Sequence, residues 1–210
     1  MRIKIRRGAL QSTLLAAQWT LAAAGVLMLG YCGLVMAGTW AFQRDQNRRL
    51  GELMETRQAA GSPMLRASEA VPLQISHGAA QGGLIGRLEI PRLGLSVVVV
   101  EGVDQSTLRR SAGHIPGTAL PGQPGNVGIS GHRDTLFRPL RNIRKDDAIT
   151  VTTVFGEYRY RVVSTRIVAP TDVSVLDPGK DEVLTLVTCY PFYFIGPAPS
   201  RFIVRAERMI

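Results

Sequence analysis

The chain has 210 residues, of which 45% are hydrophobic and 6% aromatic, and its formal net charge at pH 7 is +9. The basic residues beyond the N-terminus are scattered, without a basic stripe or an aromatic stacking array, so we expect no nucleic-acid partner. Two cysteines are present, one of them inside a long apolar run, which excludes a disulfide framework in the remainder of the chain.

The N-terminal part of the sequence predicts a membrane anchor. Residues 1–18 open with a basic run, and residues 19–40 contain no charged side chain and are bounded by Trp19 and Trp40. A spanning helix needs about 20 apolar residues, and tryptophan is typical of its two ends. We therefore expect an uncleaved, single-pass transmembrane signal anchor at 19–40. A cleaved signal peptide is the alternative, although its apolar core is shorter, about 7 to 15 residues.

The charges around this anchor set an expected topology. Lys4 and three arginines precede it and three arginines follow it closely, so the positive-inside rule leans only slightly towards a cytoplasmic N-terminus. With that orientation the C-terminal part is extracytoplasmic. Residues 41–83 come next. Their first part has the apolar spacing of a membrane-proximal helix, and their second part has the glycines and prolines of a spacer.

Residues 84–210 predict an all-β domain. Apolar or alternating runs bounded by turn residues indicate strands at 84–90, 95–100, 127–131, 148–154, 157–168, 183–188 and 202–206. A helical turn with Asp104 as its N-cap is predicted at 104–109, and a turn or short helix at 136–143. Many short strands without a long helix favour a β-barrel or a β-sandwich around one hydrophobic core.

The strand predicted at 183–188 runs directly into Cys189, the one cysteine outside the apolar run. A loop rich in prolines and aromatic residues follows, and Arg201 opens the next predicted strand. If the two strands are neighbours, a thiol and a guanidinium meet at one end of the sheet, which suits a nucleophile and a charge stabiliser. The alternative is a packing role for Cys189 and a solvated charge at Arg201, because free cysteine is among the most buried residue types.

A nucleophilic thiol needs a proton carrier, and two histidines of the all-β domain compete for that role. His132 ends the strand predicted at 127–131 and is followed by charged residues, so its imidazole is expected at a strand end, as Cys189 is. His114 lies ahead of a loop rich in proline and glycine. The two positions are not equivalent, but the residue pattern alone leaves the choice open.

Together these residues resemble the sortases, a family of membrane-anchored cysteine transpeptidases. The Thr-Leu-x-Thr-Cys run at 185–189 is similar to the active-site strand of that family, and Gly-His-Arg-Asp at 131–134 to the segment with its catalytic histidine. Arg201 falls at the position of the essential arginine, and residues 85–91 resemble the first strand. The likeness spans the whole all-β domain. The loop after the cysteine is most similar to class D sortases, including those of Gram-negative bacteria.

The resemblance implies a fold, a mechanism and partners. The expected fold is all-β, a closed sortase-like β-barrel of about eight strands with short helices, preceded by one transmembrane helix. Cys189 is then the nucleophile that cleaves a Leu-Pro-x-Thr-Gly-like sorting signal through a thioacyl-enzyme, with His132 as acid and base and Arg201 as oxyanion stabiliser. The implied partners are a protein with a C-terminal sorting signal, an amine acceptor and the membrane.

The resemblance also suggests two substrate-binding residues. Thr188 stands next to the nucleophile, and His114 lies in a Gly-His-x-Pro-Gly-Thr stretch that resembles the one lining the sortase cleft. No cofactor is expected. No metal is expected either, because the sequence has no zinc motif and no ordered calcium loop around its candidate aspartates, which are Asp146, Asp147, Asp172 and Asp181.

Two other functions stay open at this level. A membrane-tethered cysteine protease would use the same residues and release its product to water. A non-catalytic envelope β-domain would need Cys189 for packing alone, and would leave the ordered set of His132, Cys189 and Arg201 without an explanation.

Overall fold

The structure is a computed structural model that describes residues 7–59, 82–194 and 196–209. The start of the predicted basic N-terminus and most of the predicted spacer, residues 60–81, lie outside the described residues. The chain divides into two compact units, Met1–Ala41 and Phe42–Ile210.

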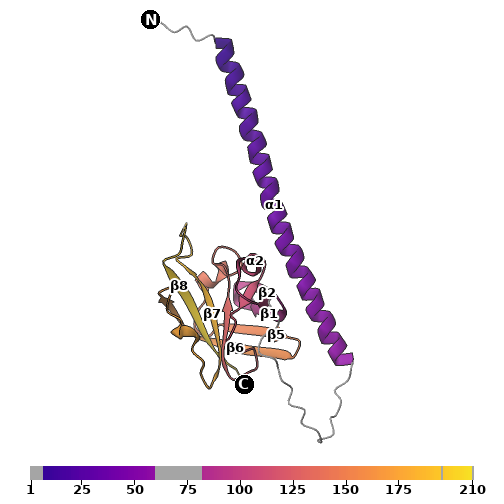
Figure 1. The fold of residues 1–210 in the computed structure, drawn as a ribbon, viewed down its shortest axis with the longest axis vertical. Coiled ribbons are helices and arrows are strands. Elements are labelled where there is room, and N and C mark those ends of the chain that lie inside the picture. The colour runs from indigo at the N-terminus through magenta and orange to yellow at the C-terminus, as the bar shows by residue number, and fades with distance from the viewer. Residues whose placement is uncertain (1–6, 60–81, 195, 210) are drawn as a thin grey trace, which may run out of the picture. The chain divides into compact units, whose positions relative to one another are not determined.

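Helix α1 (Arg7–Ala59) is continuous over 53 residues (Figure 1). The predicted anchor and the predicted membrane-proximal helix are therefore parts of one helix. The physical reason is that no proline interrupts this stretch, and proline is the residue that most strongly breaks a helix. Its portion Ser12–Arg57 is long and apolar enough, by length and composition, to be a candidate membrane span. The boundaries predicted at 18/19 and 40/41 stay predictions.

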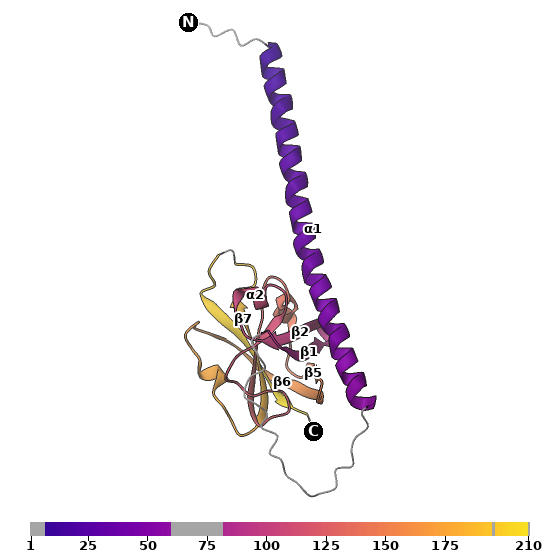
Figure 2. The same ribbon diagram turned by 45° about the vertical axis from the view of Figure 1, so that its right-hand side comes forward.

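Eight strands of the described residues form a closed barrel in the order β1-β2-β3-β4-β7-β8-β6-β5. Their bounds are β1 (Leu84–Ile90), β2 (Leu95–Glu101), β3 (Ala112–His114), β4 (Gly125–Ser130), β5 (Ala148–Thr153), β6 (Gly156–Val168), β7 (Glu182–Tyr190) and β8 (Ser200–Arg208). The predicted all-β barrel is confirmed, and the sandwich alternative is excluded. Figure 1 shows β7 beside β8, and Figure 2 shows β1, β2 and β5 next to one another.

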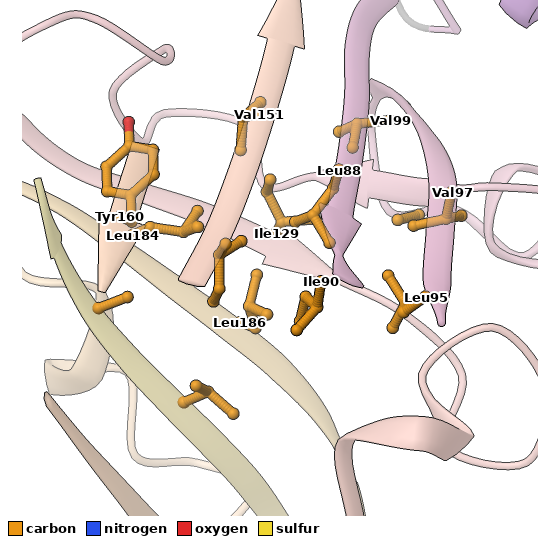
Figure 3. Packing of buried hydrophobic residues seen from close by; sticks show 14 of the residues in the cluster. Leu88, Ile90, Leu95, Val97, Val99, Ile129, Val151, Tyr160, Leu184 and Leu186 are labelled. Atoms are coloured by element: carbon orange, nitrogen blue, oxygen red, sulfur yellow. The ribbon is translucent and has the colours of Figure 1, made fainter. Parts of the chain in front are cut away.

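The barrel interior is filled by aliphatic side chains from strands on all sides of it (Figure 3). Leu88, Ile129, Leu184 and Leu186 are fully buried there, as the apolar runs in the sequence predict. Tyr160 of β6 adds a fully buried ring to this core, and burial raises the pKa of its phenol to about 12. The core therefore lies between the strands whose ends carry the candidate site, among them β4, β7 and β8.

Strand β3 was not predicted from the sequence, and it completes the barrel wall between β2 and β4. It is parallel to β2, with Glu101 beside His114, and antiparallel to β4, with His114 beside Ile129. Its middle residue, Gly113, leaves no room for a side chain, because a Cβ atom there would lie 2.1 Å from the carbonyl oxygen of Gly102. Three residues centred on a glycine give no alternating apolar signal.

Short helices occupy several of the connections. They are α2 (Gln105–Leu108), and the 3-10 turns η1 (Pro91–Leu93), η2 (Arg138–Asn142) and η3 (Ser174–Leu176). The predicted N-cap is confirmed, because Asp104 Oδ1 accepts hydrogen bonds from the backbone N–H groups of Ser106 at 2.9 Å and Thr107 at 3.1 Å.

The buried carboxylate of Asp147 ties η1 to the segment after η2. Its two oxygens accept hydrogen bonds from the guanidinium of Arg92, and the Arg144 backbone N–H donates to Oδ2 at 2.7 Å. These donors, the Arg92 side chain foremost, hold the pKa of Asp147 below its ordinary value of 3.8. One side chain thus fixes two connections on the outside of the barrel.

Candidate active site

The candidate nucleophile lies near the end of β7. Apolar and β-branched residues make the preceding part of β7 a strand that is buried almost throughout, in agreement with the prediction for 183–188. Cys189 itself is a free, half-buried thiol. The strand ends one residue later, where the peptide between Tyr190 and Pro191 is cis. The thiol is therefore held at the rim of the barrel on a rigid element.

Arg201 is placed directly opposite this thiol. Strands β7 and β8 are antiparallel neighbours, and Cys189 and Arg201 are register partners in that pair. Side chains at directly opposed positions share one face of the sheet, with Cβ atoms about 4.5 to 5.5 Å apart. The Arg201 Nη1 atom donates to the carbonyl oxygen of Ser200 at 3.1 Å and, more weakly, to that of Ala198 at 3.4 Å. The condition set in the sequence analysis, that the two strands are neighbours, is therefore met.

His132 reaches the same end of the barrel along β4. Strands β4 and β7 are parallel, and their last register pair is Ser130 with Val187. The pairing continues by one hydrogen bond, from the Gly131 backbone N–H to the Val187 carbonyl at 3.1 Å. His132 and Cys189 each follow that last pair by two residues on adjacent parallel chain segments, so they lie at the same level along the strands. His132 is half-buried.

The turn after His132 is fixed by the core. The Phe137 backbone N–H donates to the His132 carbonyl at 2.9 Å, and the Phe137 ring is fully buried. That ring packs on Gly131 so closely that a Cβ atom there would lie 2.8 Å from it. The absence of a side chain at Gly131 therefore allows the phenyl group to anchor the turn that carries His132.

Thr188 is buried, with 2% of its surface exposed. Its hydroxyl donates a hydrogen bond of 2.7 Å to the Gly131 carbonyl and so joins the residue before Cys189 to the residue before His132. A contact between this hydroxyl and substrate would need that bond to change, and the substrate-binding role of Thr188 stays a prediction.

His114 lies within the sheet, beside Ile129, and the structure does not bring it to the strand ends where His132 and Cys189 lie. Its side chain is 3% exposed, and both ring nitrogens have protein partners. Nδ1 lies 2.7 Å from Glu101 Oε2, and Nε2 lies 2.9 Å from the Ala119 carbonyl oxygen. Nε2 also lies 3.0 Å from the Thr118 hydroxyl oxygen, so protein groups hold the ring from both of its nitrogens. A contact between His114 and substrate stays a prediction.

Tyr190, Phe192 and Phe202, which follow the candidate nucleophile in the chain, form an aromatic cluster that the sequence analysis did not single out. The Phe202 ring lies 5.3 Å from that of Phe192 and 6.3 Å from that of Tyr190, measured between centroids. The cluster packs the start of the β7–β8 loop against β8. The aromatic residues around Cys189 were the available signal, but their mutual packing depends on the strand register.

A closed β-barrel that carries a free thiol at its rim, opposite an arginine, is an architecture suited to a cysteine-dependent acyl-transfer enzyme. Comparison with known proteins gives the family. Residues 88–209 match the Sortase domain model. The chain is 31% identical over 188 residues to Sortase D of Bacillus subtilis, covering 89% of this chain and 94% of that protein. This chain therefore belongs to the sortase family of cysteine transpeptidases.

Two further comparisons agree with this assignment. Sortase A of Listeria monocytogenes is 32% identical over 110 residues, covering 50% of this chain and 49% of that protein. A Sortase D5 transpeptidase of Clostridium perfringens superposes with a TM-score of 0.63 at 23% identity, over 80% of this chain and 98% of that chain, and supports the fold. The resemblance to class D sortases in particular is confirmed by the 31% identity to Sortase D.

Proposed function

We propose that this chain is a membrane-anchored sortase that cleaves a Leu-Pro-x-Thr-Gly-like signal through a thioacyl-enzyme on Cys189 and transfers the acyl group to an amine. The observation that supports the proposal is the strand register, which brings the backbone positions of three residues to one end of the barrel. Arg201 is the register partner of Cys189 across β7 and β8, and His132 follows the end of β4 at the level that Cys189 has on β7.

The proposed reaction has two halves. The Cys189 thiol gives its proton to His132 and attacks, as thiolate, the carbonyl carbon of the signal threonine; a carbon–sulfur bond forms, and the bond to the following glycine nitrogen breaks as His132 passes that proton to the nitrogen. The acceptor amine then attacks the thioester carbonyl, His132 takes the proton of this amine, and the Cys189 sulfur leaves. No oxidant or cofactor is needed, because each half only exchanges one acyl bond for another.

Arg201 is the proposed oxyanion stabiliser. Its position across from Cys189 puts a guanidinium on the face of the sheet where the tetrahedral oxygen develops. The bonds from Nη1 to loop carbonyls hold the planar group in one orientation, and the fork of remaining donors suits a developing charge. The same bonds link the arginine to the loop that joins β7 and β8.

The proposed topology concerns α1, the candidate membrane span. We propose that this helix is a single-pass anchor and that the barrel is extracytoplasmic, in keeping with the cell-envelope role of sortases. The test is protease added to intact spheroplasts, which should digest the part of the chain after Arg44 and spare the first residues. Protection of the barrel would reverse the orientation.

The chemical proposal is tested with the full chain in detergent, a Leu-Pro-x-Thr-Gly peptide library and an added amine. Wild-type protein should yield peptides cleaved after threonine and joined to the amine, and Cys189→Ala should yield none. Release of free acid alone, at an amine concentration that competes with water, would identify a cysteine protease. Cleavage by Cys189→Ala would refute the role of the thiol.

The same assay separates the two histidines. His132→Ala should abolish turnover, whereas His114→Ala should retain part of it in the molecules that fold. Full activity of His132→Ala would end its assignment as the proton carrier. Equal loss in both variants, measured per folded molecule, would contradict the assignment of the role to His132 alone.

A further inference from the structure

Arg133 directly follows the candidate catalytic histidine, yet its side chain is only 8% exposed. The two residues after it, Asp134 and Thr135, are exposed, as expected of a surface turn. An arginine is almost never buried to this degree unless its guanidinium is paired or hydrogen-bonded, because desolvation of the charge is costly. Its burial therefore points to a specific set of acceptors.

Those acceptors belong to the β7–β8 loop, between Cys189 and Arg201 in the chain. Arg133 Nη2 donates to the carbonyl oxygens of Phe194 at 2.7 Å and Gly196 at 2.9 Å. The guanidinium carbon also lies 5.8 Å from the centroid of the Phe194 ring. One side chain of the turn that begins at His132 thus holds the loop whose two ends carry the thiol and the other guanidinium.

The other hydrogen bonds described for this loop are longer. The Phe194 backbone N–H donates to the Pro191 carbonyl at 3.4 Å. Arg201 Nη1, from β8, donates to the loop carbonyl of Ala198 at 3.4 Å. The Arg133 bonds, at 2.7 and 2.9 Å, are the shortest hydrogen bonds among those described for the loop, and charge-assisted bonds are roughly twice as strong as neutral ones. Without them, two carbonyls lose their donor.

We propose that Arg133 is a positioning residue for the acyl-transfer reaction. It sets the place of Cys189 and Arg201 relative to His132 by fixing the β7–β8 loop to the turn after His132. The inference rests on the catalytic roles proposed for those three residues. Arg133 contacts neither substrate nor reacting atoms in this account, and its effect is geometric. A misplacement of about 1 Å between reacting groups costs about 100-fold in rate.

The test compares Arg133→Ala with Arg141→Ala in the full chain. Arg141 is a matched control, because it is exposed and lies over a ring of the same loop, 5.5 Å from the Tyr193 centroid. Per folded molecule, Arg133→Ala should lower kcat for the best library peptide about 100-fold, with a smaller change in KM. Arg141→Ala should stay within about threefold of wild type. Added guanidinium ion should restore part of the lost turnover.

A second readout needs no substrate. The rate of Cys189 alkylation by iodoacetamide, followed by peptide mass spectrometry, should show an altered pH profile in Arg133→Ala and the wild-type profile in Arg141→Ala. An arginine that only stabilises the fold would lower Tm and leave both this profile and kcat per folded molecule unchanged. That result would overturn the inference.

Arg133→Lys keeps the charge but presents one compact donor group instead of a fork. If Arg133→Ala does not fold, Arg133→Lys tests the positioning role in its place. It should lose at least tenfold in kcat, and a wild-type kcat would overturn the inference. Failure of the proposed function looks different. In that case either the wild-type protein cleaves none of the library peptides, or Cys189→Ala still cleaves one of them. The alkylation profile needs no substrate, so it still tests whether Arg133 positions Cys189 and His132.

Discussion

Replacing Thr188 with valine removes one buried hydrogen bond and almost nothing else. The hydroxyl donates to the Gly131 carbonyl at 2.7 Å, and the side chain is 2% exposed, so valine fills the same space and leaves that carbonyl without its donor. A buried polar group left unsatisfied costs about 1–3 kcal/mol. Because this bond joins the residues before Cys189 and before His132, we also expect kcat to fall, by about 100-fold if the two groups separate by about 1 Å.

Thr185→Val is the matched control for Thr188→Val. Thr185 lies on the same strand, is fully buried, and donates a bond of the same length, 2.7 Å, to Asn126 Oδ1. Both variants should therefore lose roughly 2–12 °C in Tm, but only Thr188→Val should lose turnover per folded molecule. The assay pairs thermal melts with peptide turnover. Equal turnover in the two variants would refute the positioning argument, and a raised KM with unchanged kcat and Tm would instead indicate a substrate contact of Thr188.

Three further predictions concern single side chains. Arg92 holds the pKa of Asp147 below 3.8, so this carboxylate stabilises the fold above about pH 4 and the contribution is lost as pH falls through the folded value. Asp147→Asn should melt lower than wild type at pH 7, and the difference should shrink below about pH 4; a constant difference would contradict the ion pair. Tyr160 has its pKa raised from 10.0 to about 12, so wild type should lose up to about 3 kcal/mol between these pH values, and Tyr160→Phe should lack that loss in alkaline denaturant melts. Equal alkaline loss in both proteins would count against burial of the phenol. Arg201→Lys should keep Cys189 alkylation and lose about 100-fold in turnover, and a wild-type rate would make Arg201 a mere surface charge.

Most strands were predictable because each has a strong local pattern. The run 84–90 alternates as a half-buried strand does, and 183–188 is apolar or β-branched on both faces, and the structure has strands at both places. The Asp104 cap was predictable for the same reason, since the bonds it makes lie within three residues.

Features that depend on register between distant strands could not be predicted. Strand β3 is recognisable only once β2 and β4 lie on either side of it. The burial of His114 follows from the parallel pairing that places Glu101 beside it, and the sequence contains no sign of that pairing. Thr188 is a similar case, because its acceptor, Gly131, is distant in the chain.

In the candidate site too, features with a local sequence pattern could be predicted and features that depend on distant contacts could not. The residue types, their order and the strand ends of Cys189, His132 and Arg201 were predictable, since each stands beside a patterned strand. The burial of Arg133 could not be predicted, because its acceptors are main-chain carbonyls of a loop. Every residue has such a carbonyl, so the sequence does not indicate which ones accept. Charged side chains after a histidine predict an exposed turn, and this one is an exception made by the fold.

The proposed thioacyl-enzyme is tested most directly by mass spectrometry of the full chain mixed with the library peptide and no amine. The account predicts a mass increase equal to the peptide up to its threonine, located on Cys189, that disappears when amine is added and is absent in Cys189→Ala. An adduct on another residue, or amine-dependent product from Cys189→Ala, would contradict it.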